Sequence, residues 1–486
     1  MSPDLIGILP ELVLIIGGLA LLVLPWIRSA RLLGLLTLCL LIGAADLKLL
    51  NLTKQAFPAL LFSGMFLQDR LSLFFQLVIL GSVLLVTLSL MGYARQEVRN
   101  RRELYSLLLL TTVGLLLVVG AQHLALVYIG LELVSVLSYL LAGIDKRESL
   151  SIEGALKYFL FGSLATGTML YGISLLYGLT GTMDLTALAT SFSKVFAQVP
   201  LLATVSLLFL VVGIGFKIAL VPFHMWAPDA YEGAPTPVTA FFSVGPKLAG
   251  FAILIRVFLL GFSPNLDVWP PLFIGLAVLT MTFGNVVALV QTNIKRLLAY
   301  SSIAHAGTMA IGLGLATPMG LTATLYYLVA YLLMNIGAFA GAIAVENAAG
   351  RQDLGAFAGL SQREPVLALM MTIALLSLAG IPPMAGFFAK MWIFGAAIQT
   401  NAIGVAVIAA LNSVIALFYY AKIIRAIYLD PAPAGAGVLP RSRALQVALG
   451  VCTIGLFVVG LWPGRWMVFI ADTLPLSLRS TTLPWM

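Results

Sequence analysis

Long apolar runs separated by short polar connections cover most of this chain of 486 residues. A helix needs about 20 mainly apolar residues to cross the hydrocarbon core of a bilayer. The runs therefore predict an all-α polytopic membrane protein with about fourteen transmembrane helices in one bundle. The expected spans are approximately 4–26, 31–52, 72–94, 104–120, 122–143, 152–180, 200–224, 237–262, 271–292, 297–316, 320–346, 365–399, 401–428 and 443–468.

Two of these spans contain residues that interrupt a helix. The stretch 365–399 would be about 50 Å long as a helix, against a core of about 30 Å, and has Gly-Ile-Pro-Pro at 380–383. The stretch 200–224 has Pro222 close to Lys217. Proline removes a backbone donor and clashes with the preceding turn, so the seventh and twelfth helices are expected to be discontinuous. The alternative is a simple kink, but broken backbone at membrane depth is tolerated inside protein or beside water.

Short strings recur in the same order at offsets of 166–170 residues. The pairs are HLALVYIG at 123–130 with NIKRLLAY at 293–300, ALKYFLFGS at 155–163 with TLYYLVAYL at 324–332, FHMW at 223–226 with AKMW at 389–392, and LIR at 254–256 with IIR at 423–425. The offset spans five helices, and an odd number makes the second copy enter from the opposite side. The pattern predicts inverted five-helix repeats at 104–262 and 271–428, after a three-helix segment at 1–103 and before a C-terminal helix within 429–486.

The basic residues of the connections gather on one side of the expected bundle. One face receives Arg28, Arg31, Arg95, Arg99, Arg101, Arg102, Lys146, Arg147, Arg351, Arg363, Arg441 and Arg443, and the other receives Lys54, Arg70, Lys194 and Arg479. The positive-inside rule makes the basic face cytoplasmic. Because an even number of spans places both ends of the chain on one side, both termini are predicted to be periplasmic.

The composition narrows the function further. The chain is 61% hydrophobic and 9% charged, whereas soluble domains are nearer one quarter charged. Cys39 and Cys452 form no motif, which excludes a cysteine-ligated iron–sulfur cluster or zinc site within this chain. Three histidines argue against haem ligation, and neither a dinucleotide fingerprint nor a phosphate-binding loop is present. We expect no cofactor or metal in this chain, and the net charge of +8 needs no nucleic-acid partner because it lies mostly in the connections.

Five charged residues interrupt the apolar spans: Glu132, Lys157, Lys217, Lys247 and Lys390. A charge at the centre of a membrane helix costs roughly 2.5–3.5 kcal/mol on insertion scales. Buried titratable groups in a row are typical of proteins that move ions or protons, and such groups titrate as a coupled set. A chain that keeps several of them is therefore expected to use them.

Each buried charge also has a structural interpretation. Lys217 is the natural cationic partner of Glu132, and the pair could be a fixed ion pair. Lys247 is a proton carrier if it alternates between its neutral and charged forms, or a packed, hydrogen-bonded lysine. Lys390 follows the expected break, and its alternative is snorkelling to an interface. Lys157 lies near the surface, where snorkelling is equally reasonable.

Several other polar residues are weaker candidates. Lys295, next to Arg296, is a candidate carrier or a topology signal. His224 and His305 titrate near neutrality and could relay protons, or could be packing residues. Asp229 and Glu232 lie in the Pro-rich stretch APDAYEGAPTP and could gather protons at the surface or cap helices.

Three long strings carry a resemblance to a known family. The chain resembles the antiporter-like membrane subunits of respiratory complex I in three strings: GFKIALVPFHMWAPDAYEGAPTPVTAFFSVGPK, NIKRLLAYSSIAHAG and LSLAGIPPMAGFFAKMWIF. The family also includes the large subunits of multisubunit cation/proton antiporters, and the resemblance is strongest from about 122 to 395. A lysine at 390, and a chain that ends about 18 residues after the last expected span, resemble the subunit N branch.

The resemblance implies a function without redox chemistry in this chain. NADH, FMN, iron–sulfur clusters and quinone would be bound by partner subunits, and the chain would contact the neighbouring antiporter-like subunit, small membrane subunits and lipid in a bacterial inner membrane. Glu132 and Lys217 would form a pair in the inlet half-channel of the first repeat. Lys247, assisted by His305, would be the central carrier, and Lys390 the carrier of the outlet half-channel. Lys157 and Lys295 also match family positions.

Two other functions share these features. A multisubunit sodium/proton antiporter would have the same bundle and lysines, but a sodium site should show further buried carboxylates besides Glu132. A structural subunit with inactive half-channels would not need an intact set of charges in both repeats. The same strings are also compatible with a photosynthetic homologue of the complex that uses plastoquinone.

Overall fold

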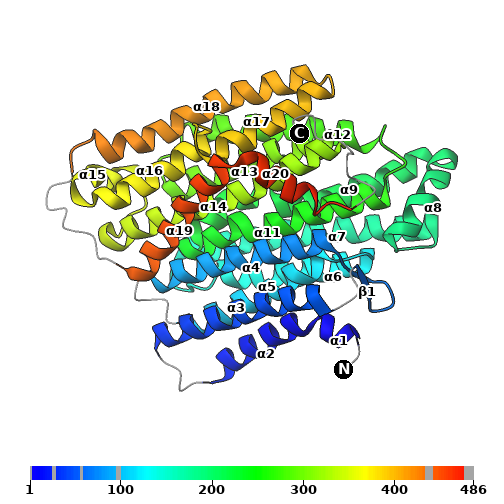
Figure 1. Cartoon of the computed structure of the whole chain (residues 1–486), viewed down its shortest axis with the longest axis horizontal. Coiled ribbons are helices and arrows are strands. Elements are labelled where there is room, and N and C mark those ends of the chain that lie inside the picture. Colours follow the sequence, from blue (N-terminus) through cyan, green and yellow to red (C-terminus); the bar gives the residue numbers. More distant parts are fainter. Residues whose placement is uncertain (1–2, 25–28, 55–57, 95–99, 433–441, 476–486) are drawn as a thin grey trace.

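The computed structural model describes residues 3–24, 29–54, 58–94, 100–432 and 442–475, without the side chains of 52–54. These residues form one bundle of roughly parallel and antiparallel helices, with the N-terminal helices along one edge and α18 along the opposite edge (Figure 1). The helices of the N-terminal segment and first predicted repeat are α1 (Pro3–Gly7), α2 (Leu9–Val23), α3 (Ala30–Lys54), α4 (Arg70–Met91), α5 (Arg101–Val119), α6 (Leu124–Ala142), α7 (Ser149–Thr180), α8 (Leu185–Gln198), α9 (Pro200–Ile218), α10 (Trp226–Gly233) and α11 (Thr236–Arg256), which continues as the π-helix η1 (Val257–Gly261).

The second predicted repeat and the C-terminal part follow in the same bundle. They contain α12 (Trp269–Ala288), α13 (Ile294–Gly314), α14 (Pro318–Ala349), the 3₁₀ helix η2 (Leu354–Phe357), α15 (Leu360–Arg363), α16 (Pro365–Ala379), α17 (Ala385–Gln399), α18 (Ile403–Tyr428), α19 (Arg443–Leu461) and α20 (Pro463–Ala471). A small antiparallel hairpin of β1 (Ala59–Leu61) and β2 (Phe66–Gln68) joins α3 to α4.

Eleven helices in the described part of the chain are long and apolar enough to cross a membrane. Two shorter apolar helices, Leu9–Val23 and Pro365–Ala379, match further expected spans. The predicted span 297–316 corresponds to α13, which carries Lys295 and Arg296 at its start. The polytopic helical fold is therefore confirmed, and the count of fourteen stays a prediction.

Both expected breaks are present. Helix α9 ends at Ile218, Ala219 adopts φ = 60°, and the chain is not helical again until α10 begins at Trp226. Helix α16 ends at Ala379, Gly380 adopts φ = 89°, and α17 begins at Ala385. Each first half thus ends in a left-handed residue, which satisfies its last carbonyls and turns the chain.

Matched contacts at opposite ends of the bundle support the predicted inverted repeat. His123, which caps α6, forms an isolated β-bridge with Asp184, and Asn293, which caps α13, forms one with Asp353. The long helices α7 and α14, both 32 residues, precede Asp184 and Asp353 and end in left-handed glycines. Figure 1 places α8, which follows the first bridge, and α15, which follows the second, at opposite ends.

One string match behind the repeat was wrong. FHMW at 223–226 lies in the link before α10, whereas AKMW at 389–392 lies inside α17. The left-handed residues that mark the two breaks are Ala219 and Gly380. Ala219 and Gly380 are fewer positions apart along the chain than the members of the matched string pairs. The two breaks therefore do not align at the offset of those strings. His224 is therefore not the structural counterpart of Lys390.

Sequence periodicity also missed the amphipathic helix α8. Its buried residues Leu185, Leu188 and Phe192 occupy one face, while the other face is polar. It lies at the end of the bundle that carries the β1 label in Figure 1. Amphipathic helices have no run of 20 apolar residues, so a search for spans does not find them.

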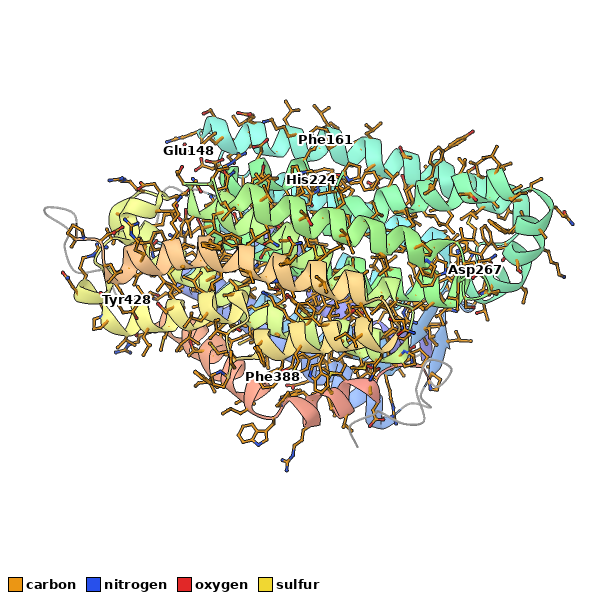
Figure 2. The ribbon with its side chains drawn as sticks, turned by 90° about the horizontal axis from the view of Figure 1, so that it is seen from above. Glu148, Phe161, His224, Asp267, Phe388 and Tyr428 are labelled. Atoms are coloured by element: carbon orange, nitrogen blue, oxygen red, sulfur yellow. The ribbon has the colours of Figure 1, made fainter. Side chains whose placement is uncertain are left out.

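The described connections agree with the predicted sidedness. Glu148 and Tyr428 lie at one end of the bundle and Asp267 lies at the other (Figure 2). Part of the pattern lies outside the described residues, namely both ends of the chain, the side chain of Lys54, and Arg28, Arg95, Arg99, Arg441 and Arg479. The assignment of one face to the cytoplasm therefore stays a prediction.

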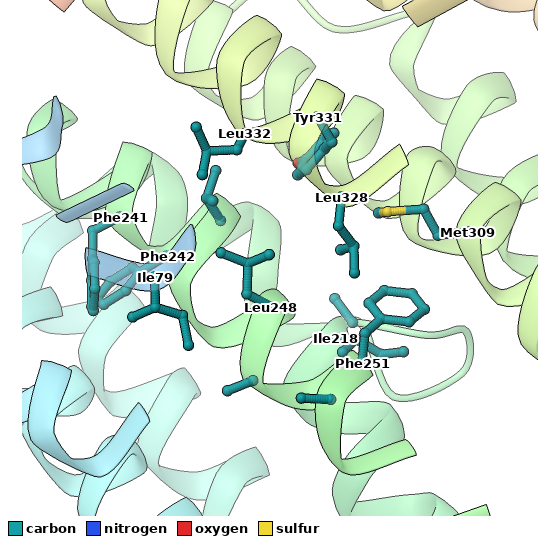
Figure 3. Packing of buried hydrophobic residues seen from close by; sticks show 14 of the residues in the cluster. Ile79, Ile218, Phe241, Phe242, Leu248, Phe251, Met309, Leu328, Tyr331 and Leu332 are labelled. Atoms are coloured by element: carbon teal, nitrogen blue, oxygen red, sulfur yellow. The ribbon is translucent and has the colours of Figure 1, made fainter. Parts of the chain in front are cut away.

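Helix α11 forms the centre of the bundle. All of its residues from Thr236 to Arg256 are buried, and it packs against α4, α5, α9, α13 and α14. Figure 3 shows this packing, in which Leu248 and Phe251 of α11 lie beside Ile218 of α9 and Leu328 of α14. A helix that is buried all round cannot place a polar side chain in water, so the polar residues of α11 must find partners inside the protein.

Candidate functional site

Lys217 lies in the last turn of α9, directly before the first break. Its side chain is 2% exposed, and its Nζ donates to Ser135 Oγ on α6 at 2.9 Å. The Tyr158 ring lies 6.0 Å from Nζ, within range of a cation–π contact. A cation near the C-terminus of a helix is also stabilised by the helix dipole, so the break supplies part of the setting that holds this lysine.

The expected ion pair between Glu132 and Lys217 is not formed directly. Lys217 donates to Ser135, which lies one helical turn beyond Glu132 on α6. Among the described residues, Glu132 Oε1 is buried and has no hydrogen-bond partner. Residues three apart share a face of a helix, so Glu132 and Ser135 lie on the same face of α6, and the Lys217 amine bonds the serine. A direct contact between the two groups is thus absent from the described residues, and their pairing in the half-channel stays a prediction.

Lys247 lies at the middle of α11 and is 1% exposed. Its Nζ donates to both the backbone carbonyl and the Oγ of Ser302 on α13, the latter at 2.5 Å. The Tyr331 hydroxyl of α14 donates to the same Oγ at 2.7 Å, and its ring lies 5.7 Å from Nζ. Three helices therefore hold one amine through a serine and a tyrosine.

His305 lies one turn beyond Ser302 on α13 and is 3% exposed. Its two ring nitrogens contact the hydroxyls of Tyr327 at 2.8 Å and Tyr420 at 3.0 Å. Its ring centroid lies 5.4 Å from that of Tyr331. A histidine with a hydroxyl on each nitrogen can pass a proton through its ring by changing tautomer.

Lys390 lies six residues into α17 and is 7% exposed. Its Nζ donates to the carbonyl of Ala379, the last residue of α16, at 2.8 Å. Gly380 makes this approach possible, because a Cβ at that position would lie 2.9 Å from Lys390 Cδ. The second break thus both exposes the carbonyl and leaves room for the lysine.

A small polar cavity connects the last two groups. His305 and Lys390 both line it, together with Asn285, Asn412 and Thr308. Asn285 and Asn412 are joined at 3.1 Å, and Tyr419 donates to Asn285 at 3.0 Å. The cavity has room for about one water molecule. His305 and Lys390 therefore share a cavity with amide groups and room for water. His305 lies beside the Lys247 group through its ring contact with Tyr331.

Lys157 belongs to an ion-pair network near the end of the bundle. Its Nζ contacts Glu153 at 2.6 Å and Asp229 at 2.7 Å, and Arg296 joins Asp229 at 2.6 Å and Glu232 at 2.7 Å. Burial acts to raise the pKa of the Asp229 carboxyl, but the hydrogen bonds and charges of Lys157 and Arg296 outweigh it and lower that pKa. The Lys157 side chain is 38% exposed. These contacts give it a structural role, and its role as a carrier stays a prediction.

Lys295 and His224 are placed away from the contacts described above. Lys295 is buried and donates to the carbonyls of Glu232 and Ala234, each at 2.6 Å, where α10 ends. The His224 ring packs edge-on against Phe283, with centroids 4.6 Å apart, in the link before α10 (Figure 2). Lys295 therefore holds the second half of the broken helix in place.

Sequence reasoning missed the hydroxyl and amide partners. Ser135, Ser302 and Tyr331 contact the buried lysines directly. A local signal exists for two of them: Ser135 is one turn after Glu132, and Ser302 is one turn before His305. Tyr327, Tyr331 and Asn335 repeat at intervals of four on α14, which places them on one helix face.

Among the described residues, no group of three or more histidine, cysteine, aspartate or glutamate side chains could hold a metal ion. The donor set of the buried row is instead amines, hydroxyls, one imidazole and amides. This chemistry suits proton transfer between neighbours. Fold and site together define a polytopic membrane translocase with discontinuous helices.

Comparison with known proteins places the chain within this class. Residues 121–416 match the family described as NADH:quinone oxidoreductase/Mrp antiporter, transmembrane, and the chain belongs to that family. It is 44% identical over 443 residues to NADH-quinone oxidoreductase subunit N 2 of Sorangium cellulosum, covering 87% of this chain and 88% of the relative. It is 38% identical over 470 residues to NADH-quinone oxidoreductase subunit N of Trichlorobacter lovleyi, covering 96% of each.

A solved structure shows the same fold. A chain of respiratory complex I from Thermus thermophilus with bound aureothin matches with a TM-score of 0.80 and 34% sequence identity, over 94% of this chain and 98% of that chain. The expected resemblance to the membrane subunits of complex I is therefore confirmed.

Proposed function

We propose that this chain is a proton-translocating membrane-arm subunit, of the subunit N type, of an NADH-quinone oxidoreductase. The observation that carries the proposal is the buried row of Lys217, Lys247, His305 and Lys390, which starts at one broken helix and ends at the other. The row would move protons through lysine, histidine, hydroxyl groups and water. Quinone reduction in other subunits would drive it, so NADH, FMN, iron–sulfur clusters and quinone would be bound by partners.

The energetic requirement is modest. Moving one proton against 100 mV costs about 2.3 kcal/mol. A change in the pairing between two buried charges a few ångströms apart involves several kcal/mol at an effective dielectric constant of about 20. A shift of Lys217 from Ser135 toward the partnerless Glu132 Oε1 would be such a change. It would alter the field at Lys247 and favour release of its proton toward His305 and Lys390.

The proposed setting follows from the family. The chain would lie in a bacterial plasma membrane with both termini periplasmic, beside a neighbouring antiporter-like subunit, small membrane subunits and lipid. The first repeat would form the inlet half-channel and the second the outlet half-channel. The family also contains Mrp antiporter subunits. A sodium/proton antiporter is the alternative function, which the subunit N names of the two relatives make less favourable.

Proton pumping and electron transfer measured together would separate these functions. In vesicles that contain the assembled complex, Lys217→Ala is expected to lower proton uptake and NADH–quinone electron transfer together. Lys194→Ala, a change to an exposed lysine of α8, is the matched control and should leave both rates unchanged. If electron transfer stays normal and only cation/proton exchange is lost, the chain is an antiporter subunit and the proposal fails.

A further inference from the structure

A polar cavity of about 330 Å³ opens on the face of the bundle that carries the basic connections. Its described walls come from the α6–α7 connection, the α10–α11 link, the start of α13 and the connection after α14. Tyr93, Glu232, Lys295 and Gln352 are among the lining residues. The cavity holds several water molecules at the volume that water occupies in proteins. It is therefore a wet recess that reaches inward from one face.

Glu346 lies behind the wall of this cavity. It is in the last turn of α14 and is 5% exposed. Its Oε1 accepts from Gln352 Nε2 at 2.7 Å and from the Tyr93 hydroxyl at 3.2 Å, and both donors line the cavity. Its Oε2 accepts from Thr236 Oγ1 at 2.5 Å. The carboxylate thus connects the wet recess to the first residue of α11.

A stripe of hydroxyl groups leads from Glu346 to the central lysine. Thr236, Thr239, Ser243 and Lys247 follow at intervals of three or four residues, which places them on one face of α11. All four are buried. At 1.5 Å per residue the stripe is about 16 Å long.

Asn335 marks a place for water along the stripe. Its Nδ2 donates to Ser243 Oγ at 2.6 Å. Its Oδ1 is buried and, in the described part of the chain, has no hydrogen-bond partner. A buried acceptor without a donor in the protein is normally satisfied by an ordered water. A water there would stand beside Ser243, one helical turn from Lys247.

The route from Lys217 to Lys247 is less continuous. The contacts of the Lys217 amine within the described residues are Ser135 Oγ and the Tyr158 ring. Tyr158 stacks on Trp226 at 4.0 Å and lies against the edge of Phe242 at 5.7 Å. These aromatic contacts offer no chain of proton donors and acceptors toward Lys247.

We propose that the cavity is a direct proton entrance to Lys247 and that Glu346 is the residue that takes up the proton there. A proton from cavity water binds the Glu346 carboxylate. It then passes along the α11 hydroxyls and intervening water to the neutral amine of Lys247, and Glu346 returns to its ionised form. Lys217 then acts on Lys247 through its charge instead of supplying the proton. This inference rests on the proposed function and names the entrance of the same site.

Carboxylate replacement tests the role of Glu346. In vesicles that contain the assembled complex, Glu346→Gln is expected to lower proton pumping about tenfold, while Glu346→Asp restores much of it because a carboxylic acid is again present. Glu364→Gln is the matched control. Glu364 is a similarly buried carboxylate at the start of α16, and its replacement should leave pumping unchanged.

The outcomes separate the entrance from the function itself. Lys247→Ala is measured in parallel. If Lys247→Ala abolishes pumping and Glu346→Gln does not change it, the entrance is elsewhere and the proposed function stands. If Lys247→Ala pumps normally, the proposed function fails. If Glu346→Gln and Glu346→Asp are equally impaired in a fully assembled complex, Glu346 ties α14 to α11 and carries no proton.

Blocking the cavity gives a second test that does not depend on assembly of a Glu346 variant. In a chain with Cys39 and Cys452 replaced by alanine, Leu150→Cys places a thiol in the cavity wall. A bulky, membrane-impermeant thiol reagent should then lower pumping severalfold relative to the same variant without reagent. Lys422→Cys, at an exposed site on the same face outside the cavity, is the control. Normal pumping by fully labelled Leu150→Cys would overturn the entrance.

Discussion

The two broken helices hold their lysines in different ways. In the first, Lys217 lies before the break and donates to a side chain, Ser135 Oγ, at 2.9 Å. In the second, Lys390 lies after the break and donates to a backbone carbonyl, that of Ala379, at 2.8 Å. The group near Lys217 is Glu132, which belongs to α6. The group near Lys390 is His305, which lines the same cavity.

The difference shows which lysine can respond to its surroundings. Lys217 donates to the Ser135 hydroxyl, which itself donates to the Leu131 carbonyl at 2.7 Å. Glu132, one turn earlier on α6, offers a carboxylate that can compete for the amine, so the pairing of Lys217 can switch. The carbonyl of Ala379 is fixed by α16, so this hydrogen bond of Lys390 is a fixed one, and under the proposed function Lys390 would exchange protons with the cavity next to it. The first half is therefore suited to receiving a signal, and the second to passing a proton onward.

Removal of either lysine should have the largest effect and should test whether both halves are needed. Lys217→Ala and Lys390→Ala are each expected to lower proton pumping by about tenfold or more, because each removes a charge or carrier from the row. The measurement is proton uptake by vesicles with equal amounts of assembled complex. A Lys390→Ala variant that pumps normally would show that the second half is not an exit route.

Substitution at the two left-handed residues should have unequal effects. Gly380→Ala adds a Cβ that would lie 2.9 Å from Lys390 Cδ at φ = 89°, so it should displace Lys390 and lower pumping severalfold, besides costing about 1 kcal/mol of stability. Ala219→Gly relieves a left-handed alanine and should change the unfolding free energy by less than about 1 kcal/mol.

Thermal unfolding of the solubilised chain and pumping would be followed for both variants. If Gly380→Ala and Ala219→Gly lose pumping to the same extent, the close approach of Lys390 to Gly380 is unimportant.

Loss of the serine hydroxyl should affect the first half alone. Ser135→Ala removes the hydrogen-bond partner of Lys217, a contact worth about 1.5–3 kcal/mol when one group is charged. Glu132 on the same face of α6 is then a carboxylate open to the amine, so we expect the pair to become fixed and pumping to fall about threefold. Ser138→Ala, one turn further along α6 and bonded to a carbonyl of its own helix, is the control. Unchanged pumping by Ser135→Ala would remove the proposed switch.

The smallest effect is expected at the ion-pair network around Asp229. Because the pKa of Asp229 is lowered in the folded protein, its ion pairs stabilise the fold above the unfolded value of about 3.9. That stability is lost as the pH falls through the lower, folded value. Asp229→Asn should lower stability at pH 7 by roughly 0.5 kcal/mol, since these groups are partly exposed, and should have no effect once the pH is below the lowered, folded pKa of Asp229.

The midpoint of thermal unfolding across this pH range measures this effect. A large loss of pumping in Asp229→Asn would contradict the structural role of the network and return Lys157 to the list of carriers.

Much of the fold was predictable because span length and proline position are local properties. The two discontinuous helices could be predicted from Pro222 and from Gly-Ile-Pro-Pro at 380–383. The lysines could be recognised as candidate carriers because a charge in lipid is costly. The partners were not predictable in the same way. Ser302 and Tyr331 come from α13 and α14 and meet Lys247 only after three helices pack together. In the same way, Lys217 on α9 bonds Ser135 on α6 and does not contact Glu132 directly.

If Lys247 is the central proton carrier, its removal should change the number of protons that the complex pumps per electron. Lys247→Ala should abolish pumping by this subunit and lower that ratio. The control is Glu11→Gln combined with Lys48→Met, which removes a buried ion pair of the N-terminal segment at 2.6 Å without leaving a lone charge. We predict a lower ratio for Lys247→Ala and an unchanged ratio for the control. An unchanged ratio in assembled Lys247→Ala complex would contradict that prediction.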